Sequence, residues 1–135
     1  MRKSQVVKLY LELGKNLKSF KEEIIKRGFS KIDEGAYKLV YSKNKLGYVV
    51  KIANSGNDEF ASIPQEIKKY YLKPFFCDNQ VVVQKRAKTE NGANERTFNI
   101  IKKELGYRNC EMLDVSEFNC GEINNKPVLF DFAKI

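Results

Sequence analysis

The spacing of apolar residues changes at Gly28, and this change limits the possible folds more than any other feature of the chain. Before Gly28, apolar residues recur every three or four positions, as in one stripe of an α-helix. The stripe consists of Val6, Leu9, Tyr10, Leu13, Leu17, Phe20 and Ile24. Ser19 and Glu22 have capping-box spacing, so the stretch is either one helix or two helices that meet near Lys18. We expect Gly28 to end it in both cases.

After Gly28, β-branched and aromatic residues occur in short groups separated by turn formers, which is typical of strands. These residues are Ile32, Tyr37, Leu39, Val40, Tyr41, Tyr48, Val49, Val50 and Ile52. The pattern predicts three successive antiparallel strands. We expect a tight turn at Glu34-Gly35 and a longer hairpin loop from Lys43 to Gly47.

Helical spacing returns between Ile63 and Leu72, where Pro64 is acceptable in a first turn. The segment from Gln80 to Lys85 is rich in valine and predicts a further strand. The next segment, from Thr89 to Glu95, is rich in turn formers and predicts a loop.

The last part of the chain predicts a helix followed by a hairpin. The helix contains apolar residues at positions 98, 101 and 105, and Gly106 ends it. Two short strands are expected at Cys120–Ile123 and Pro127–Phe132, joined by a turn at Asn124-Asn125. The full order of helices and strands predicts an α+β fold.

The 135 residues, 42% of them apolar, can form one hydrophobic core but are too few for two independent ones, so we expect a single domain over residues 1–135. No apolar run reaches the roughly 18 to 20 residues of a membrane helix, and the N-terminus lacks the apolar core of a signal peptide. The three cysteines form no CxxC pair, which favours a reducing compartment. We therefore expect a cytoplasmic protein without a membrane partner.

The sequence contains no histidine, which excludes Ser-His-Asp catalysis, Cys-His catalysis and histidine metal sites. The 25 basic residues outnumber the 17 acidic ones, for a formal net charge of +8. Such a charge favours anionic partners such as phosphate, nucleic acid or acidic protein surfaces. The alternative is that these lysines are ordinary solvated surface residues.

The string from Ile32 to Tyr41, IDEGAYKLVY, resembles the glycine-rich strand-turn-strand of protein kinases. Gly35 matches the second of three glycines, and Asp33 and Lys38 replace the first and third. The resemblance implies a nucleotide site lined by Gly35, Ala36, Tyr37, Lys38, Val40 and Val49. One hypothesis is that Lys38 supplies charge where a backbone contact is lost; the alternative is an ordinary hairpin.

Lys51 lies in the apolar string YVVKI, so its side chain leaves the strand on the same face as Val49. A lysine that points inward from an apolar strand requires an anion. In protein kinases, a lysine in this position contacts the inner phosphates of ATP and pairs with a glutamate on the next helix. The resemblance implies Glu66 as that partner, with Glu59 in reserve.

The string LDVSEFNCG resembles the kinase catalytic loop, because Asp114 and Asn119 have the spacing of its aspartate and asparagine. Met112 and Leu113 replace the usual His-Arg pair. The resemblance implies that the carboxylate of Asp114 accepts or orients the proton of an attacking hydroxyl. The amide oxygen of Asn119 is implied to bind Mg²⁺.

The string VLFDFA, from Val128 to Ala133, is similar to the strand that leads into the kinase Asp-Phe-Gly triplet, with Ala133 in place of the glycine. Asp131 is implied to be the principal Mg²⁺ ligand. Only four residues follow Asp131, so we expect the activation segment and most of the helical lobe to be missing.

The resemblance implies a protein kinase-like fold. Its parts would be an extra N-terminal helical segment (1–28), an antiparallel N-lobe sheet with an αC-type helix (29–86), and a reduced C-lobe with a catalytic-loop helix and a β-hairpin (87–135).

The implied activity is transfer of phosphate from ATP, with Mg²⁺, to a Ser, Thr or Tyr hydroxyl of a protein, in the manner of a small viral or phage kinase. The partner would be a protein substrate or a host protein. One alternative is a pseudokinase that binds nucleotide or a partner without turnover. Another is a basic nucleic-acid-binding module, although the sequence has no zinc ligands or aromatic-basic stacking motif.

Overall fold

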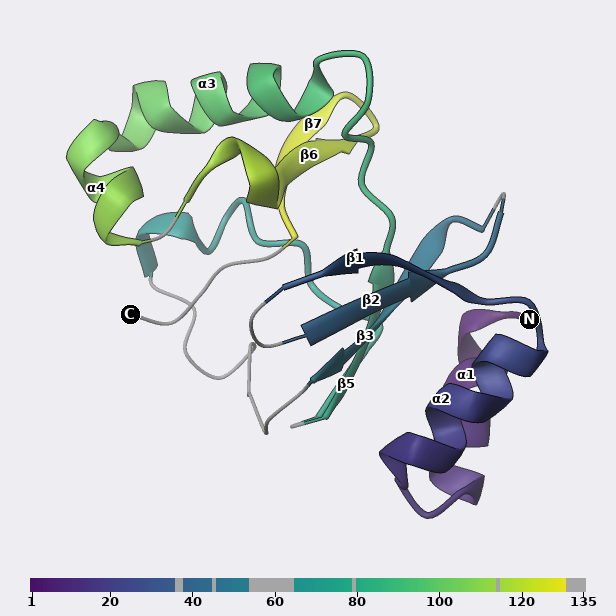
Figure 1. Cartoon of the computed structure of the whole chain (residues 1–135). Coiled ribbons are helices and arrows are strands. Elements are labelled where there is room, and N and C mark those ends of the chain that lie inside the picture. Colours follow the sequence, from purple (N-terminus) through teal and green to yellow (C-terminus); the bar gives the residue numbers. More distant parts are fainter. Residues whose placement is uncertain (36–37, 45, 54–64, 79, 114, 131–135) are drawn as a thin grey trace. The chain divides into compact units, whose positions relative to one another are not determined.

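The computed structural model describes residues 1–35, 38–44, 46–53, 65–78, 80–113 and 115–130. The chain divides into two compact units (Figure 1). Unit 1 is Met1–Asp58 with Pro74–Lys85, and unit 2 is Glu59–Lys73 with Arg86–Ile135. Each unit has its own cluster of buried apolar side chains. The elements form an α+β fold, as predicted.

Unit 1 begins with two helices, α1 (Lys3–Glu12) and α2 (Leu17–Lys26), so the two-helix alternative is confirmed. The predicted capping box at Ser19 is wrong. Asn16 is the N-cap of α2, and its side-chain oxygen accepts a hydrogen bond of 2.9 Å from the backbone N–H of Ser19. Gly28 follows α2 with a positive φ of 96°, a conformation that suits glycine, and the chain leaves the helix there as predicted.

Five antiparallel strands make the sheet of unit 1, in the order β1-β2-β3-β5-β4. They are β1 (Ser30–Glu34), β2 (Lys38–Ser42), β3 (Tyr48–Ala53), β4 (Phe76–Cys77) and β5 (Val81–Lys85). The strands predicted in this part of the chain are confirmed. The two residues of β4 are too few for a sequence pattern to reveal.

One face of this sheet packs with α1 and α2 in a single buried cluster. Residues directly opposite each other on antiparallel strands share a face, so the strand register defines rows across the sheet. The rows on the helix-covered face are Leu39, Ile52, Val81 and Tyr41, Val50, Val83, Phe76. The helices contribute Val6, Tyr10, Phe20 and Ile24. Each fully buried side chain of this size stabilises the fold by about 1.5–3 kcal/mol.

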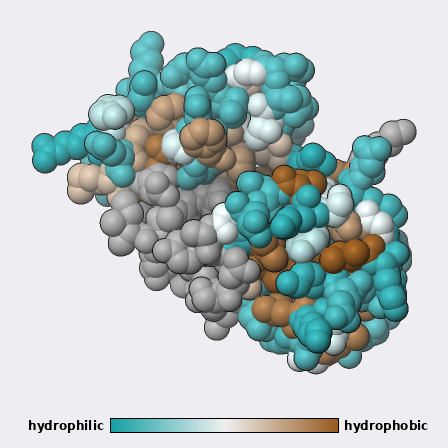
Figure 2. Space-filling model, viewed as in Figure 1, coloured by the Kyte–Doolittle hydropathy of each residue, from teal (hydrophilic) through white to brown (hydrophobic). Residues whose placement is uncertain are grey.

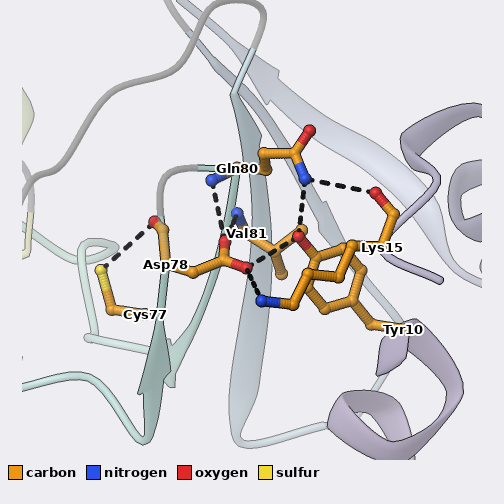
Figure 3. A network of polar contacts seen from close by, with 6 residues as sticks. All are labelled: Tyr10, Lys15, Cys77, Asp78, Gln80 and Val81. Atoms are coloured by element: carbon orange, nitrogen blue, oxygen red, sulfur yellow. Dashed lines mark hydrogen bonds and ion pairs between the residues drawn. The ribbon is translucent and has the colours of Figure 1, made fainter. Parts of the chain in front are cut away.

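A polar network centred on Asp78 joins α1 to the turn before β5 (Figure 3). Tyr10 donates a 2.8 Å hydrogen bond to Oδ2 of Asp78, and Gln80 donates a 2.9 Å hydrogen bond to the Tyr10 hydroxyl. Oδ1 of Asp78 accepts from the backbone N–H groups of Gln80 and Val81, both at 2.8 Å. Burial, followed by the hydrogen bond with Asp78, raises the pKa of Tyr10 to about 12.

Unit 2 contains two consecutive helices, α3 (Ala93–Leu105) and α4 (Tyr107–Met112). The predicted helix and its end at Gly106 are confirmed, although α3 begins inside the segment predicted to be a loop. The short helix α4 was not expected. No helix in the described part of the chain is long and apolar enough to cross a membrane.

A hairpin of β6 (Cys120–Ile123) and β7 (Lys126–Leu129) follows the helices, as predicted. Asn124 and Asn125 both have positive φ, 52° and 63°, which a two-residue turn of this kind requires. The strand β7 ends at Leu129, earlier than predicted, within the residues that the structure describes.

The helix predicted from Ile63 to Leu72 is not present in the described residues 65–72, which contain only the 3-10 turn η1 (Gln65–Ile67). The backbone there bonds to β7 instead. The N–H of Leu129 donates to the carbonyl of Tyr70 at 2.7 Å, and the N–H of Leu72 donates to the carbonyl of Leu129 at 2.8 Å. These tertiary hydrogen bonds replace the helical ones, so the local spacing of apolar residues misled the prediction.

Candidate functional site

The second face of the sheet in unit 1, opposite the helix-covered one, carries Lys51. Lys51 is paired with Val40 on β2 and with Val82 on β5, and Val82 is paired with Cys77 on β4. These four side chains therefore form one row across the face, and Asp33 on β1, which is paired with Val40, extends the row. Lys51 is 3% exposed, so its ammonium group and aliphatic stem are both buried.

The next row toward the start of β3 consists of Val49 and Gln84, which are directly paired. Both side chains are buried. Alternation along β3 explains the arrangement, because Val50 and Ile52 point to the helices while Val49 and Lys51 point to the other face. The sequence predicts the shared face of Val49 and Lys51, and the structure confirms it.

Lys38 lies toward the other end of β3, where it is paired with Ala53 and is half-buried. The backbone N–H of Gly35 donates a 2.8 Å hydrogen bond to the carbonyl of Lys38, which closes the turn between β1 and β2. Ala53 comes two residues after Lys51 on β3, so Lys38 lies on the same face of the sheet as Lys51, one row closer to this turn. Ala36 and Tyr37 fall outside the described residues.

A buried lysine between valines is costly for packing alone. Taking an ammonium group out of water costs several kcal/mol unless negative or hydrogen-bonding groups compensate it. An apolar residue would continue the pattern of Val40, Val49 and Val82 without that cost. The buried ammonium group of Lys51 therefore requires compensating negative or hydrogen-bonding groups.

In unit 2, Asn119 lies at the end of the 3-10 turn η2 (Glu117–Asn119), directly before β6. Its side-chain oxygen accepts a 2.7 Å hydrogen bond from the hydroxyl of Ser116. Its backbone carbonyl accepts a 3.1 Å hydrogen bond from the N–H of Phe130. Phe130 precedes Asp131 in the sequence, so Asn119 lies beside the segment that leads to Asp131.

The donor chemistry at Asn119 fits a hard cation such as Mg²⁺. An amide oxygen has two acceptor lone pairs, so the hydrogen bond from Ser116 is compatible with metal ligation and orients the side chain. Asp114 and Asp131, the carboxylates expected in the same site, fall outside the described residues. Within the described ranges, no group of three or more His, Cys, Asp or Glu side chains could hold a metal ion.

Glu66, the expected partner of Lys51, is exposed and belongs to η1. Lys51 belongs to unit 1 and Glu66 to unit 2, so their pairing stays a prediction. Glu59, the reserve partner, is not among the described residues.

Sequence reasoning did not include Gln84, Val82 or Cys77 among the site residues. The alternation in the string VVVQK places Val82 and Gln84 on one face of β5. Only the register between β3 and β5 shows that this face is the one that carries Lys51.

The chain was compared with protein-family models, with curated proteins and with solved structures, and none of the three comparisons found a match.

Proposed function

We propose that this protein is an ATP- and Mg²⁺-dependent phosphotransferase of the protein kinase type that acts on a Ser, Thr or Tyr hydroxyl of a protein. The observation that carries the proposal is Lys51, a buried lysine at the centre of a valine-lined sheet face. In protein kinases, the lysine that contacts the inner phosphates also lies on the third strand of the sheet.

The order of the elements supports the proposal. A five-stranded antiparallel sheet is followed by the helix α3, and the hairpin β6-β7 comes after the Asp114-to-Asn119 string. This is the order of parts implied by the kinase resemblance. The αC-type helix is the part without support in the described residues, since only η1 is present at 65–72.

The distribution of charge is also consistent with an anionic ligand in unit 1. By sequence, unit 1 has 14 Lys and Arg against 7 Asp and Glu, whereas unit 2 has 11 against 10. Most lysines in the described part of the chain are exposed, and Figure 2 shows hydrophilic residues over much of the face in view. Lys51 differs from them by its burial, so it can act on a bound anion with less screening by water.

The proposed roles follow from side-chain chemistry. Lys51 binds the inner phosphates, and Val40 and Val49 provide an apolar surface for the rest of the nucleotide. Asp114 orients the attacking hydroxyl, and Asn119 and Asp131 provide oxygen ligands for Mg²⁺. When bound, Mg²⁺ would neutralise part of the negative charge on the phosphate oxygens. Lys38 adds positive charge at the turn where the kinase pattern has glycine.

Phosphate transfer tests the proposal directly. The protein is incubated with γ-labelled ATP and Mg²⁺, with casein or histone as acceptor, beside its Asp114→Ala and Asp131→Ala variants. Transfer by the native protein that falls by about a hundredfold or more in both variants supports the kinase. Binding of Mg-ATP without transfer above the Asp131→Ala background selects the pseudokinase. Salt-dependent binding to RNA or DNA that is indifferent to Lys51→Ala selects the nucleic-acid-binding module.

A further inference from the structure

The turn that precedes α3 contains the dipeptide Asn91-Gly92, and both residues are exposed. Both have a left-handed backbone, with φ of 57° and 76°. Glycine suits this conformation, and a Cβ at Gly92 would lie 3.3 Å from Nη1 of Arg96. Asparagine is one of the few other residue types that adopt it readily. The backbone at the start of α3 therefore favours this pair of residues.

An asparagine that precedes glycine can lose its side-chain amide by reaction with its own backbone. The nitrogen of Gly92 attacks Cγ of Asn91 and forms a five-membered succinimide ring, while the side-chain nitrogen leaves as ammonia. Water then opens the ring, which restores the N–H of Gly92 and leaves aspartate or isoaspartate at position 91. The overall reaction consumes water, releases ammonia and requires no oxidant or cofactor.

The backbone nitrogen of Gly92 is available as the nucleophile. Within the ranges that the structure describes, no hydrogen bond holds its N–H. The N–H groups of the next two residues, in contrast, bond to the carbonyls of Glu90 and Thr89 at 3.1 and 3.4 Å. Glycine has no Cβ to obstruct ring closure, and its exposure lets hydroxide from the solvent remove the amide proton.

Arg96 bonds to the same peptide unit. Its Nη1 donates a 2.7 Å hydrogen bond to the backbone carbonyl of Asn91, and its Nη2 donates a 2.8 Å hydrogen bond to Oε1 of Glu122 on β6. A cation bonded to this carbonyl withdraws electron density from the Asn91-Gly92 peptide bond, so its nitrogen loses a proton more readily. The side chain of Glu122 is only 15% exposed, and its ion pair with Arg96 fixes the guanidinium in this position.

We propose that Asn91 is a self-modification site, at which Arg96 promotes conversion of the asparagine to aspartate and isoaspartate in the folded protein. The inference does not depend on Lys51 or on a nucleotide. The aspartate form places a negative charge before the N-terminus of α3, where the helix dipole favours it. The isoaspartate form routes the main chain through the former side chain and displaces the carbonyl that Arg96 binds. The modification therefore alters the link that Arg96 makes between this turn and β6.

Peptide mapping by mass spectrometry, after incubation of the native protein at mildly alkaline pH, tests the inference. Asn99 is the internal control, because it is also exposed but precedes Ile100 inside α3, where backbone N–H groups are hydrogen-bonded. The native protein should convert Asn91 about tenfold or more faster than Asn99. Equal conversion at the two positions, or none at Asn91, would overturn the inference, and this comparison requires no variant to fold.

Arg96→Met removes the guanidinium at a position whose side chain is 55% exposed, so the variant should fold, which circular dichroism verifies. It should slow conversion at Asn91 by about threefold or more. Lys103→Met, at an exposed position of the same helix, is the matched control and should convert Asn91 at the native rate. An unchanged rate in Arg96→Met, or equal slowing in both variants, would contradict the role of the guanidinium and overturn the proposal.

Discussion

Lys51 and Val82 are direct cross-strand neighbours on β3 and β5, in a row that begins with Asp33 on β1 and ends with Cys77 on β4. On the other face, the adjacent rows are apolar across β2, β3, β4 and β5, and they pack against α1 and α2. The sheet therefore separates a face that stabilises unit 1 from a face that holds a buried charge. Under the proposed function, substitutions on the first face should affect stability and substitutions on the second face should affect ligand binding.

Gly121 is expected to tolerate no side chain. A Cβ at this position would lie 2.7 Å from the carbonyl oxygen of Lys88 and 2.9 Å from the Cβ of Ala87. Gly121→Ala should lower the free energy of unfolding by about 1–3 kcal/mol, measured by urea denaturation. Gly47→Ala is the control, because a Cβ there has no atom within 4 Å. The control should be neutral or stabilising by up to about 1 kcal/mol, and equal effects of the two substitutions would contradict the geometry.

The hydroxyl of Tyr10 is expected to stabilise the docking of α1. It donates to Asp78 and accepts from Gln80, and both bonds are lost in Tyr10→Phe. The substitution should lower the free energy of unfolding by about 1–3 kcal/mol, since two half-buried partners each lose one hydrogen bond. Tyr107→Phe is the control, because Tyr107 is 68% exposed, and its effect should stay within about 0.5 kcal/mol. A Tyr10→Phe variant as stable as native protein would show that the network contributes no net stability.

The free energy of unfolding is expected to decrease at alkaline pH because of Tyr10. Folding raises the pKa of Tyr10 from 10.0 to about 12, so the folded state holds the phenolic proton more tightly than the unfolded state. The stabilisation that this provides is fully present below pH 10 and is lost as the pH rises toward 12. Unfolding midpoints measured across this range should decrease more steeply for the native protein than for Tyr10→Phe. Parallel curves for the two proteins would contradict the raised pKa.

The three cysteines are expected to differ in reactivity. Burial, followed by the neighbouring thiol of Cys110, raises the pKa of Cys120 to about 12, and burial also raises the pKa of Cys110. Few thiolates form at these two positions near neutral pH, and neither is accessible. A thiol reagent should therefore modify half-buried Cys77 first and reach the other two only on unfolding. Cys77→Ser should remove the fast phase, whereas a fast phase that persists in this variant would contradict the assignment.

The sequence predicts those parts of the fold that depend on local periodicity. The strands after Gly28 and the helix that ends at Gly106 follow from spacing and turn formers alone. The helix predicted at 63–72 fails in its described part because Tyr70 and Leu72 bond to β7, a contact with no local signal. The sequence does not predict Asn16 as the N-cap of α2, because Ser19 and Glu22 also have the spacing of a capping box.

The candidate site is likewise predicted only where the pattern within one strand is sufficient. The shared face of Lys51 and Val49 follows from alternation within one strand, so the sequence predicts it. The presence of Gln84 on that face depends on the register between β3 and β5, which no residue pattern in either strand specifies. The proximity of Asn119 to Phe130 likewise depends on the hairpin β6-β7.

The most direct test of the central claim is the binding of Mg-ATP, measured by titration calorimetry, to the native protein and to Lys51→Met. Methionine keeps the apolar stem and removes the charge, so binding should weaken by about tenfold or more. Lys18→Met, at an exposed position of α2 in the same unit, should bind as the native protein does. Equal affinities of the native protein and Lys51→Met, or no binding by the native protein, would contradict a phosphate-binding role for the buried lysine.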